Sequence, residues 1–546
     1  MYSLSRRRFA ALAAGALVVA LTGCDSDSTD AADLGENRAG AMAELGVDQQ
    51  FTATEALTFP ILYLNHPNYP IKKDWLFWSE LTKRTGVTLQ PTEVPLSDYE
   101  QKRGLLLGAG DAPFIIPKTY PHQEDAYVGS GTILPVSDYL DLMPNFKDKV
   151  AKWNLGPEID TLRQEDGKFY LLPGLHEEVW PDYSIAIRTD ILAELNLAVP
   201  KTWDELHTVL KAMKAKYPNQ YPFSDRWGVP TPGGSLLNQL AGTYGTHGGW
   251  GYLNANWDAA AGKFAFTGAQ EGYKQMLQFL NTLVKEKLLD PESFTQSDDQ
   301  AIQKLVTGKS FVISANAQSI VNEYRPALTK ANPKATIVKI PVPDGPAGHV
   351  LDTTRLENGL MVTKKARESK NFVAMMQFID WLWYSDQGQE FAKWGVPGTT
   401  YNKDASGKRT LAADVDMVGL NPKGTKHLQK DFGFGNGVFA YGGTTELLQS
   451  TFSAEEIEFQ KAMATKTVVP PAPPHPFTDE EREQATLWES PLKDHVTASS
   501  LQFILGQRDF SQWDAYLGEL RTKNMDQYLD LVVKARDRYA KDHGGK

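Results

Sequence analysis

Short apolar strands alternate with helices in the first part of this sequence, and this alternation limits the possible folds more than any other feature. Residues 59–63, 87–89 and 114–116 form short apolar runs of the kind found in buried strands. Residues 74–85 and 99–107, which lie between them, carry apolar side chains at helical spacing. Strands that alternate with helices are typical of βα units, so we predict an α/β fold with a largely parallel sheet.

The length and the charge of the chain narrow the prediction further. The 546 residues are 41% hydrophobic and 23% charged, which is ordinary for a folded globular protein. One hydrophobic core seldom serves more than about 250–300 residues, so at least two lobes are expected. The formal net charge of −11 makes nucleic acid an unsuitable partner, because phosphate binding needs a basic surface.

The N-terminus combines the features of an export signal and of a lipid anchor. A basic stretch at 5–9 precedes an apolar stretch at 10–20, which is too short to span a bilayer but suits a signal peptide. Leu21-Thr22-Gly23-Cys24 is similar to a bacterial lipobox, so we predict that residues 1–23 are a signal peptide and that Cys24 is lipidated. The arginines at 5–9 are similar to a twin-arginine signal. Sec export, or a plain secretory signal with an incidental cysteine, stays open as the alternative.

Residues 24–55 have few periodic apolar positions and many Asp, Ser, Ala and Gly residues. We predict that they form a flexible tether that holds the folded part away from the membrane. No later stretch reaches the roughly 18 apolar residues that a spanning helix needs, so no further membrane span is predicted. Cys24 is the only cysteine, which excludes an intrachain disulfide and a cysteine zinc site.

The usual catalytic signatures are incomplete. Residues 308–310 are similar to the end of a P-loop, but Gln303 stands where its first glycine is needed. Residues 176–178 lack the second histidine of a zinc protease helix, and 234–236 lack the flanking glycine of a nucleophile elbow. We therefore predict that the chain is not an enzyme of these classes. A secreted hydrolase that acts on carbohydrate through two carboxylates stays open as an alternative.

Several short motifs occur along the chain in a characteristic order. They are GDAPFI at 110–115, DGKFYLLP at 166–173, IRTDIL at 187–192, VPKTWDEL at 199–206, the helix and turn at 273–291, GVPGTTY at 395–401, FILG at 503–506 and WDAY at 513–516. From about Leu57 to the C-terminus the chain resembles the family 1 extracellular solute-binding lipoproteins of bacterial ABC importers, in their LplA-like, oligosaccharide-binding branch.

This resemblance implies a type II periplasmic-binding-protein-like fold, with two α/β lobes, a hinge and a ligand cleft between the lobes. It implies an N-terminal lobe at 56–176 plus 357–405 and a C-terminal lobe at 177–356 plus 406–546. Some relatives carry a calcium loop after the PKTWDEL helix. Here residues 214–222 take its place without the alternating carboxylates that calcium needs, so we expect no metal and no cofactor.

The resemblance also implies a function. The protein would capture a carbohydrate, as an oligosaccharide, and deliver it to the transmembrane permease subunits of an ABC transporter. It would do so as a monomer, held to the extracytoplasmic face of the cell membrane by its N-terminal lipid. The same receptor fold for a non-sugar solute, such as a peptide, is the alternative.

Candidate ligand-binding residues follow from the chemistry of sugars. A sugar has apolar C–H faces and a rim of hydroxyls, so its site needs aromatic rings and hydrogen-bonding side chains. In α/β folds such residues leave the C-terminal ends of strands. The alternative for each aromatic ring is a place in a core. Side chains of this kind, after expected strands or near expected crossings between lobes, are Lys118, Tyr120, Trp180, Tyr183, Trp227, Tyr244, Trp250, Asn316, Glu357 and Trp394.

Overall fold

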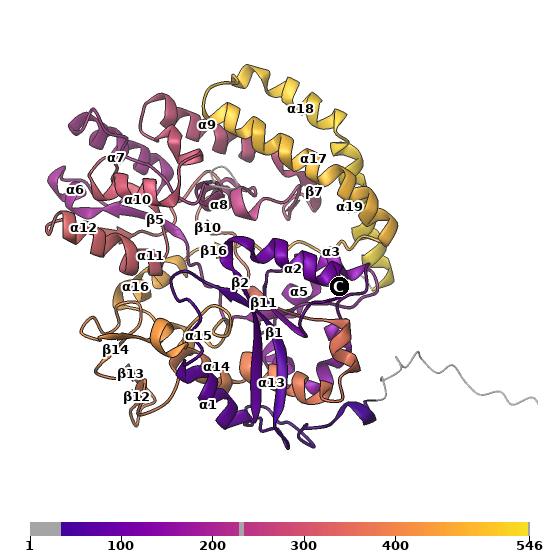
Figure 1. Cartoon of the computed structure of the whole chain (residues 1–546). Helices are drawn as coiled ribbons and strands as arrows, with labels where there is room; N and C mark the ends of the chain where they lie inside the picture. The colour runs from indigo at the N-terminus through magenta and orange to yellow at the C-terminus, as the bar shows by residue number, and fades with distance from the viewer. Residues whose placement is uncertain (1–33, 229–233, 544–546) are drawn as a thin grey trace, which may run out of the picture.

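The computed structural model describes residues 34–228 and 234–543. Figure 1 shows two lobes, with the N-terminal part of the chain in the lower lobe and the C-terminal helices over the upper one. Each lobe has its own large hydrophobic core. A smaller cluster around Ile313 and Tyr324 lies on the sheet of the second lobe. In the described residues, no helix is long and apolar enough to cross a bilayer.

The first lobe is built on a five-stranded mixed sheet. Strand β1 pairs in parallel with β2 and β3, whereas β11 runs antiparallel to β3 and β4. In the order found across the sheet, the strands are β2 (Val87–Pro95), β1 (Leu57–Asn65), β3 (Ile115–Thr119), β11 (Leu356–Val362) and β4 (Leu172–Leu175).

The helices of the first lobe include one that is buried along its whole length. Every residue of α13 (Phe372–Tyr384) is buried, because the helix carries its own apolar side chains on all of its faces. The helix therefore lies inside the core. The other helices of this lobe are α1 (Leu76–Thr85), α2 (Tyr99–Gly108), α3 (Asp125–Val128), α4 (Pro144–Lys152), α5 (Gly156–Asp160) and α14 (Asp386–Trp394).

The second lobe has a three-stranded sheet, the hairpin β6–β7 and a layer of long helices. Its sheet has the order β8 (Val312–Ala315), β5 (Ser184–Arg188), β9 (Ile337–Lys339), and the hairpin consists of β6 (Ala255–Asp258) and β7 (Lys263–Phe266). Its helices are α6 (Thr189–Glu194), α7 (Trp203–Lys216), α8 (Gly234–Ala241), α9 (Glu271–Lys285), α10 (Asp298–Val306), α11 (Ala317–Ser319), α12 (Arg325–Ala331), α16 (Ala454–Met463), α17 (Asp479–Ile504), α18 (Trp513–Thr522) and α19 (Met525–Asp542).

Short elements complete the chain. Two-residue strands β10 (Val350–Leu351) and β16 (Thr467–Val468) pair with each other. The segment after α14 holds β12 (Tyr401–Lys403), β13 (Arg409–Leu411), β14 (Val415–Asp416), β15 (Lys426–His427) and α15 (Thr445–Gln449).

The predicted parallel direction is right for β1, β2 and β3 and wrong for the other strands of the two main sheets. Strands β11 and β5 each follow a crossing from the other lobe, and each runs antiparallel to its neighbours. A strand that arrives from the opposite lobe enters the sheet from the end that faces that lobe. Apolar periodicity marks the strand but carries no information about this direction.

The predicted flexible tether over 24–55 is wrong for its second part. Residues 34–55 pack on the first lobe, with Leu45 and Phe51 buried in its core. Asn371 Nδ2 on α13 donates a hydrogen bond to the Ala39 carbonyl at 2.8 Å. Single apolar side chains anchor an irregular chain here, so no period marks the segment. Residues 24–33, the signal peptide and Cys24 lie outside the described residues.

The predicted third boundary of the lobes, after residue 405, is also wrong. Val415, Leu428 and Phe439 belong to the core of the first lobe, and Phe459 is the first later residue in the core of the second. Trp75 Nε1 donates to the Lys430 carbonyl at 2.9 Å, which ties α1 to this late segment. The chain therefore leaves the first lobe for the last time after Tyr441.

Candidate functional site

Within the described residues, three segments run between the lobes. The first holds His176, the second Arg355 and Glu357, and the third Gly442 and Gly443, and hydrogen bonds join them. His176 N donates to the Arg355 carbonyl at 2.9 Å, and Gly443 N donates to the Leu175 carbonyl at 2.7 Å. Three adjacent crossing segments form the kind of hinge about which two lobes close on a ligand.

Glu357 connects all three crossing segments through one carboxylate. This carboxylate lies 2.8 Å from His176 Nε2 on the first segment, and it accepts a hydrogen bond from Gly442 N on the third at 3.1 Å. Burial alone would raise the pKa of Glu357, but the hydrogen bond and charge of His176 hold it below its usual value. The carboxylate therefore stays ionised at neutral pH.

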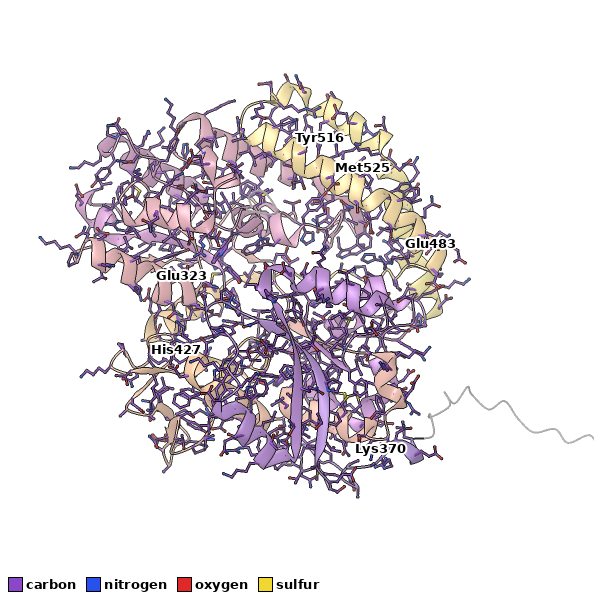
Figure 2. All side chains as sticks on the ribbon, in the orientation of Figure 1. Glu323, Lys370, His427, Glu483, Tyr516 and Met525 are labelled. Carbon is purple, nitrogen blue, oxygen red and sulfur yellow. The ribbon has the colours of Figure 1, made fainter. Side chains whose placement is uncertain are left out.

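A cavity of about 1070 Å³ lies between the lobes beside this hinge. Side chains from both lobes line it, and Figure 2 places Glu323 where the two lobes meet. The volume is at the upper end of the range of about 300–1,000 Å³ that is usual for small-molecule sites. The cavity therefore has room for a ligand larger than a monosaccharide.

The wall from the first lobe comes from the ends of β1 and β3. The rings of His66 and Tyr69 stack at 4.5 Å between centroids. Lys118 has a φ of +56°, a strained conformation for a lysine, and Arg103 Nη1 holds its carbonyl at 3.0 Å. The Lys118 ammonium lies 5.5 Å from the Tyr120 ring centroid. This wall thus presents aromatic rings and one cation to the cavity.

The charges of this first wall follow from burial and from close neighbours. Burial and the nearby Lys118 lower the pKa of His66 to about 4, so this imidazole is neutral at pH 7. Burial alone would lower the pKa of Lys118, but the facing Tyr120 and Tyr69 raise it above its usual value. Lys118 is therefore charged at neutral pH.

The wall from the second lobe is a cluster of three aromatic rings. Tyr183 lies 5.4 Å from both Trp227 and Trp250, and the two tryptophans lie 5.8 Å apart, between centroids. Tyr183 and Trp250 are 40% and 44% exposed, which is unusual for side chains of this size. A Cβ on Gly234 would lie 2.5 Å from Trp250 Nε1, so glycine at the start of α8 leaves room for this ring.

Trp227 is held in its place by charged neighbours. Its backbone has a φ of +60°, and its N–H donates to Asp298 Oδ1 at 2.9 Å. The Arg226 guanidinium lies 4.4 Å from the Trp227 ring centroid. Arg226 is paired in turn with Asp298 and Glu323, at 3.0 and 2.5 Å. The ring is therefore fixed on the wall before a ligand arrives.

Two facing aromatic walls on hinged lobes are the arrangement of a protein that closes on its ligand. A family model described as "Bacterial extracellular solute-binding protein" matches residues 78–418, more than half of the chain. The chain belongs to this family. The predicted family is thereby confirmed, and so is the prediction of a binding protein and not an enzyme, because the family consists of extracellular solute-binding proteins.

Two relatives of this solute-binding protein are named for binding carbohydrates. The chain is 25% identical over 509 residues to the fructooligosaccharide ABC transporter substrate-binding protein FusA of Streptococcus pneumoniae, covering 87% of this chain and 88% of FusA. It is 26% identical over 337 residues to the polygalacturonan/rhamnogalacturonan-binding protein YtcQ of Bacillus subtilis, covering 59% of this chain and 63% of YtcQ.

A solved structure confirms the predicted type II periplasmic-binding-protein-like fold. The crystal structure of the alginate-binding protein AlgQ2 without calcium ion superposes with a TM-score of 0.69 at 21% identity, over 89% of this chain and 99% of AlgQ2. Among the described residues of our solute-binding protein, no group of His, Cys, Asp and Glu side chains has the arrangement of a metal site.

Most of the predicted ligand-binding residues lie together around the cavity, although their contact with a ligand stays a prediction. Two of them already serve the fold: Asn316 Oδ1 caps α11 by accepting from Ser319 N at 2.8 Å, and Glu357 joins the hinge segments. Trp180 stacks on Phe452 at 6.0 Å between centroids. The residues that line the cavity are Lys118, Tyr120, Trp180, Tyr183, Trp227, Trp250, Asn316 and Glu357.

Two of the predicted residues, Tyr244 and Trp394, do not line the cavity. Tyr244 turns into the core of the second lobe, where its ring centroid lies 6.3 Å from that of Phe279. Trp394 is 1% exposed, and its Nε1 donates to Ser450 Oγ at 3.0 Å. Both rings complete helix packing, which is the alternative for any aromatic ring in a large chain.

Several cavity residues were missed in the sequence. His66 and Tyr69 directly follow the strand predicted at 59–63, so the rule of strand ends applied to them as well. Asp298 and Glu323 gave no such signal, because their role depends on Arg226, which is distant from both in the sequence.

Proposed function

We propose that this protein captures an oligosaccharide outside the cytoplasm and delivers it to the transmembrane subunits of an ABC importer. The observation that carries the proposal is the pair of facing walls, with His66, Tyr69 and Tyr120 opposite the cluster of Tyr183, Trp227 and Trp250. Aromatic rings offer flat apolar surfaces to the C–H faces of sugars. The names of FusA, YtcQ and AlgQ2 support carbohydrate as the ligand class.

Closure of the lobes follows from the position of the rings. A sugar that contacts both walls binds the closed form more tightly than the open form, because the open form offers it one wall at a time. A ligand shifts a two-state equilibrium only by this difference in affinity. The closed form would then dock on the permease.

The proposal includes the anchor predicted from the sequence. Lipidation of Cys24 would hold a monomer at the extracytoplasmic face of the membrane, with export by the twin-arginine route. Mass spectrometry of the protein from its native membrane tests the anchor, since a lipidated Cys24 shifts the mass of the N-terminal peptide. A Cys24→Ser variant would be released into the medium.

The ligand class is tested with the mature protein from residue 25 onward and a panel of oligosaccharides. Binding at 100 times the dissociation constant stabilises a folded protein by about 2.7 kcal/mol, which raises its melting temperature. We expect such a shift, with a change in tryptophan fluorescence, for at least one glycan and no turnover of it. Hydrolysis of a glycan, or shifts with peptides alone, would contradict the proposal.

A further inference from the structure

The cavity between the lobes is lined by many more carboxylates than cations. Among the described lining residues the only Lys and Arg side chains are Lys118 and Arg226. Of the two lining histidines, His66 is neutral at pH 7 and His176 is paired with Glu357. The lining carboxylates come from both lobes and from the hinge, and they are Asp182, Asp298, Asp299, Glu323, Asp352 and Glu357. The cavity is therefore acidic as a whole.

Arg226 is already used within the protein. The residue is 6% exposed, and its guanidinium is paired with Glu323 and Asp298 and also donates to the Tyr324 hydroxyl at 3.1 Å. It lies over the Trp227 ring, which it holds in place. An incoming anion would have to displace two carboxylates from this arginine. Arg226 is thus a positioning residue for Trp227, and carboxylates of the protein already occupy both of its Nη atoms.

Lys118 is the remaining cation. It lies on the first wall between Tyr120 and Tyr69, and the negative charge of Glu357 already acts on it. One lysine could balance one carboxylate of a ligand. An oligomer of uronic acids carries one carboxylate on every sugar, so most of its charges would face the acidic lining without a partner.

The carboxylates come from several different places around the cavity. Asp299 is exposed at the start of α10, and Asp352 lies beside the second crossing, where its Oδ2 is 3.2 Å from His247 Nδ1. Asp182 lies beside the first crossing, where Asn316 Nδ2 approaches it at 3.4 Å. Like charges placed against one class of ligand are a common means of specificity.

We propose that this cavity takes an uncharged oligosaccharide and rejects polyuronates of the kind named for YtcQ and AlgQ2. The inference rests on the proposed function and deepens it. Carboxylates are also good acceptors for the hydroxyls of a neutral sugar, so the acidic lining favours such a ligand through charge-assisted hydrogen bonds.

The test compares neutral and anionic oligosaccharides of matched length. Calorimetry of the mature protein with fructo-, malto-, manno- and xylo-oligosaccharides is set beside oligogalacturonates and oligomannuronates, at low and at high salt. We expect a neutral glycan to bind at least tenfold more tightly than any uronate, with little dependence on salt. A uronate that binds as tightly as the best neutral glycan overturns this inference and leaves the proposed function standing. No binding of any glycan overturns both.

Two exposed variants test the charge argument directly. Asp299→Lys reverses a charge in the cavity, and Asp530→Lys makes the same change on α19, away from it. We expect Asp299→Lys to raise the ratio of uronate to neutral affinity at least tenfold at low salt, and Asp530→Lys to leave this ratio unchanged. An equal ratio in the two variants would show that the lining charge does not select the ligand.

Discussion

The carboxylate of Glu357 lies 2.8 Å from Nε2 of His176, and this contact joins two of the segments that cross between the lobes. Because Gly442 N donates to the same carboxylate, this one side chain links all three crossing segments, beside the backbone hydrogen bonds between them. The predicted ligand residue Glu357 is therefore first a hinge residue. Its hydrogen bonds to His176 and Gly442 fix the position of its carboxylate before any ligand binds.

Replacing Glu357 tests this role. Glu357→Ala removes the acceptor and leaves His176 and Gly442 N–H without a partner in a buried place, so we expect a loss of about 1–3 kcal/mol in the free energy of unfolding. Glu357→Gln keeps an acceptor and should lose less. Urea denaturation measures both. Equal losses in the two variants would mean that the hydrogen bonds accepted by Glu357 do not stabilise the fold.

Lys393 on α14 gives a prediction about pH. It is 4% exposed, and its Nζ donates to the Ala440 carbonyl at 3.0 Å. Burial lowers the pKa of Lys393 to about 8, an effect that the Glu357 carboxylate offsets only in part. The unfolded chain keeps this proton up to about pH 10.5, so between these values it binds more protons than the folded protein.

The free energy of unfolding should therefore rise with pH in this window. The contribution of Lys393 to the free energy of unfolding is least favourable below pH 8 and rises with pH towards 10.5, by on the order of 3 kcal/mol. We predict that Lys393→Met removes this rise. Urea denaturation at several pH values across this window measures it. Parallel pH profiles of the two proteins would contradict the prediction.

The sequence predicted the elements that have a periodic apolar pattern. It missed the segments that depend on contacts with residues distant in the sequence. The strands and helices between Leu57 and Ile116 lie close to their expected positions, because each has its own apolar pattern. The last segment of the first lobe lacks such a pattern and is held by contacts such as Trp75 to Lys430. Contacts between residues so distant in the sequence cannot be predicted from the sequence pattern alone.

The site divides in the same way. Strand ends predicted Lys118 and Tyr120, and aromatic rings near the crossing predicted Tyr183. No rule separated Trp250, which lines the cavity, from Trp394, which is buried where helices pack. Trp394 ends α14 and Trp250 lies in the short turn Gly249–Gly251, and tertiary packing decides which of the two rings is buried.

Trp250 should be the most sensitive ring of the second wall. Trp250→Ala removes a side chain that is 44% exposed, so we expect the glycan that binds the natural protein to lose at least tenfold in affinity, about 1.4 kcal/mol, with little loss of stability. Calorimetry and urea denaturation separate the two effects. Trp394→Phe is the control, since it loses the bond to Ser450 and should weaken the fold but not the affinity. Equal affinity of Trp250→Ala and the natural protein would remove this ring from the site.

Phe51 tests whether residues 34–55 belong to the folded body. Its ring is fully buried and packs against Phe378 of α13 at 6.2 Å between centroids, so Phe51→Ala should leave a cavity in the first lobe and cost about 3–5 kcal/mol. Val47→Ala, at an exposed position of the same segment, should cost little. Urea denaturation compares the two variants. If both variants are as stable as the natural protein, residues 34–55 do not contribute to the fold. If only Phe51→Ala is destabilised, these residues are part of the folded first lobe.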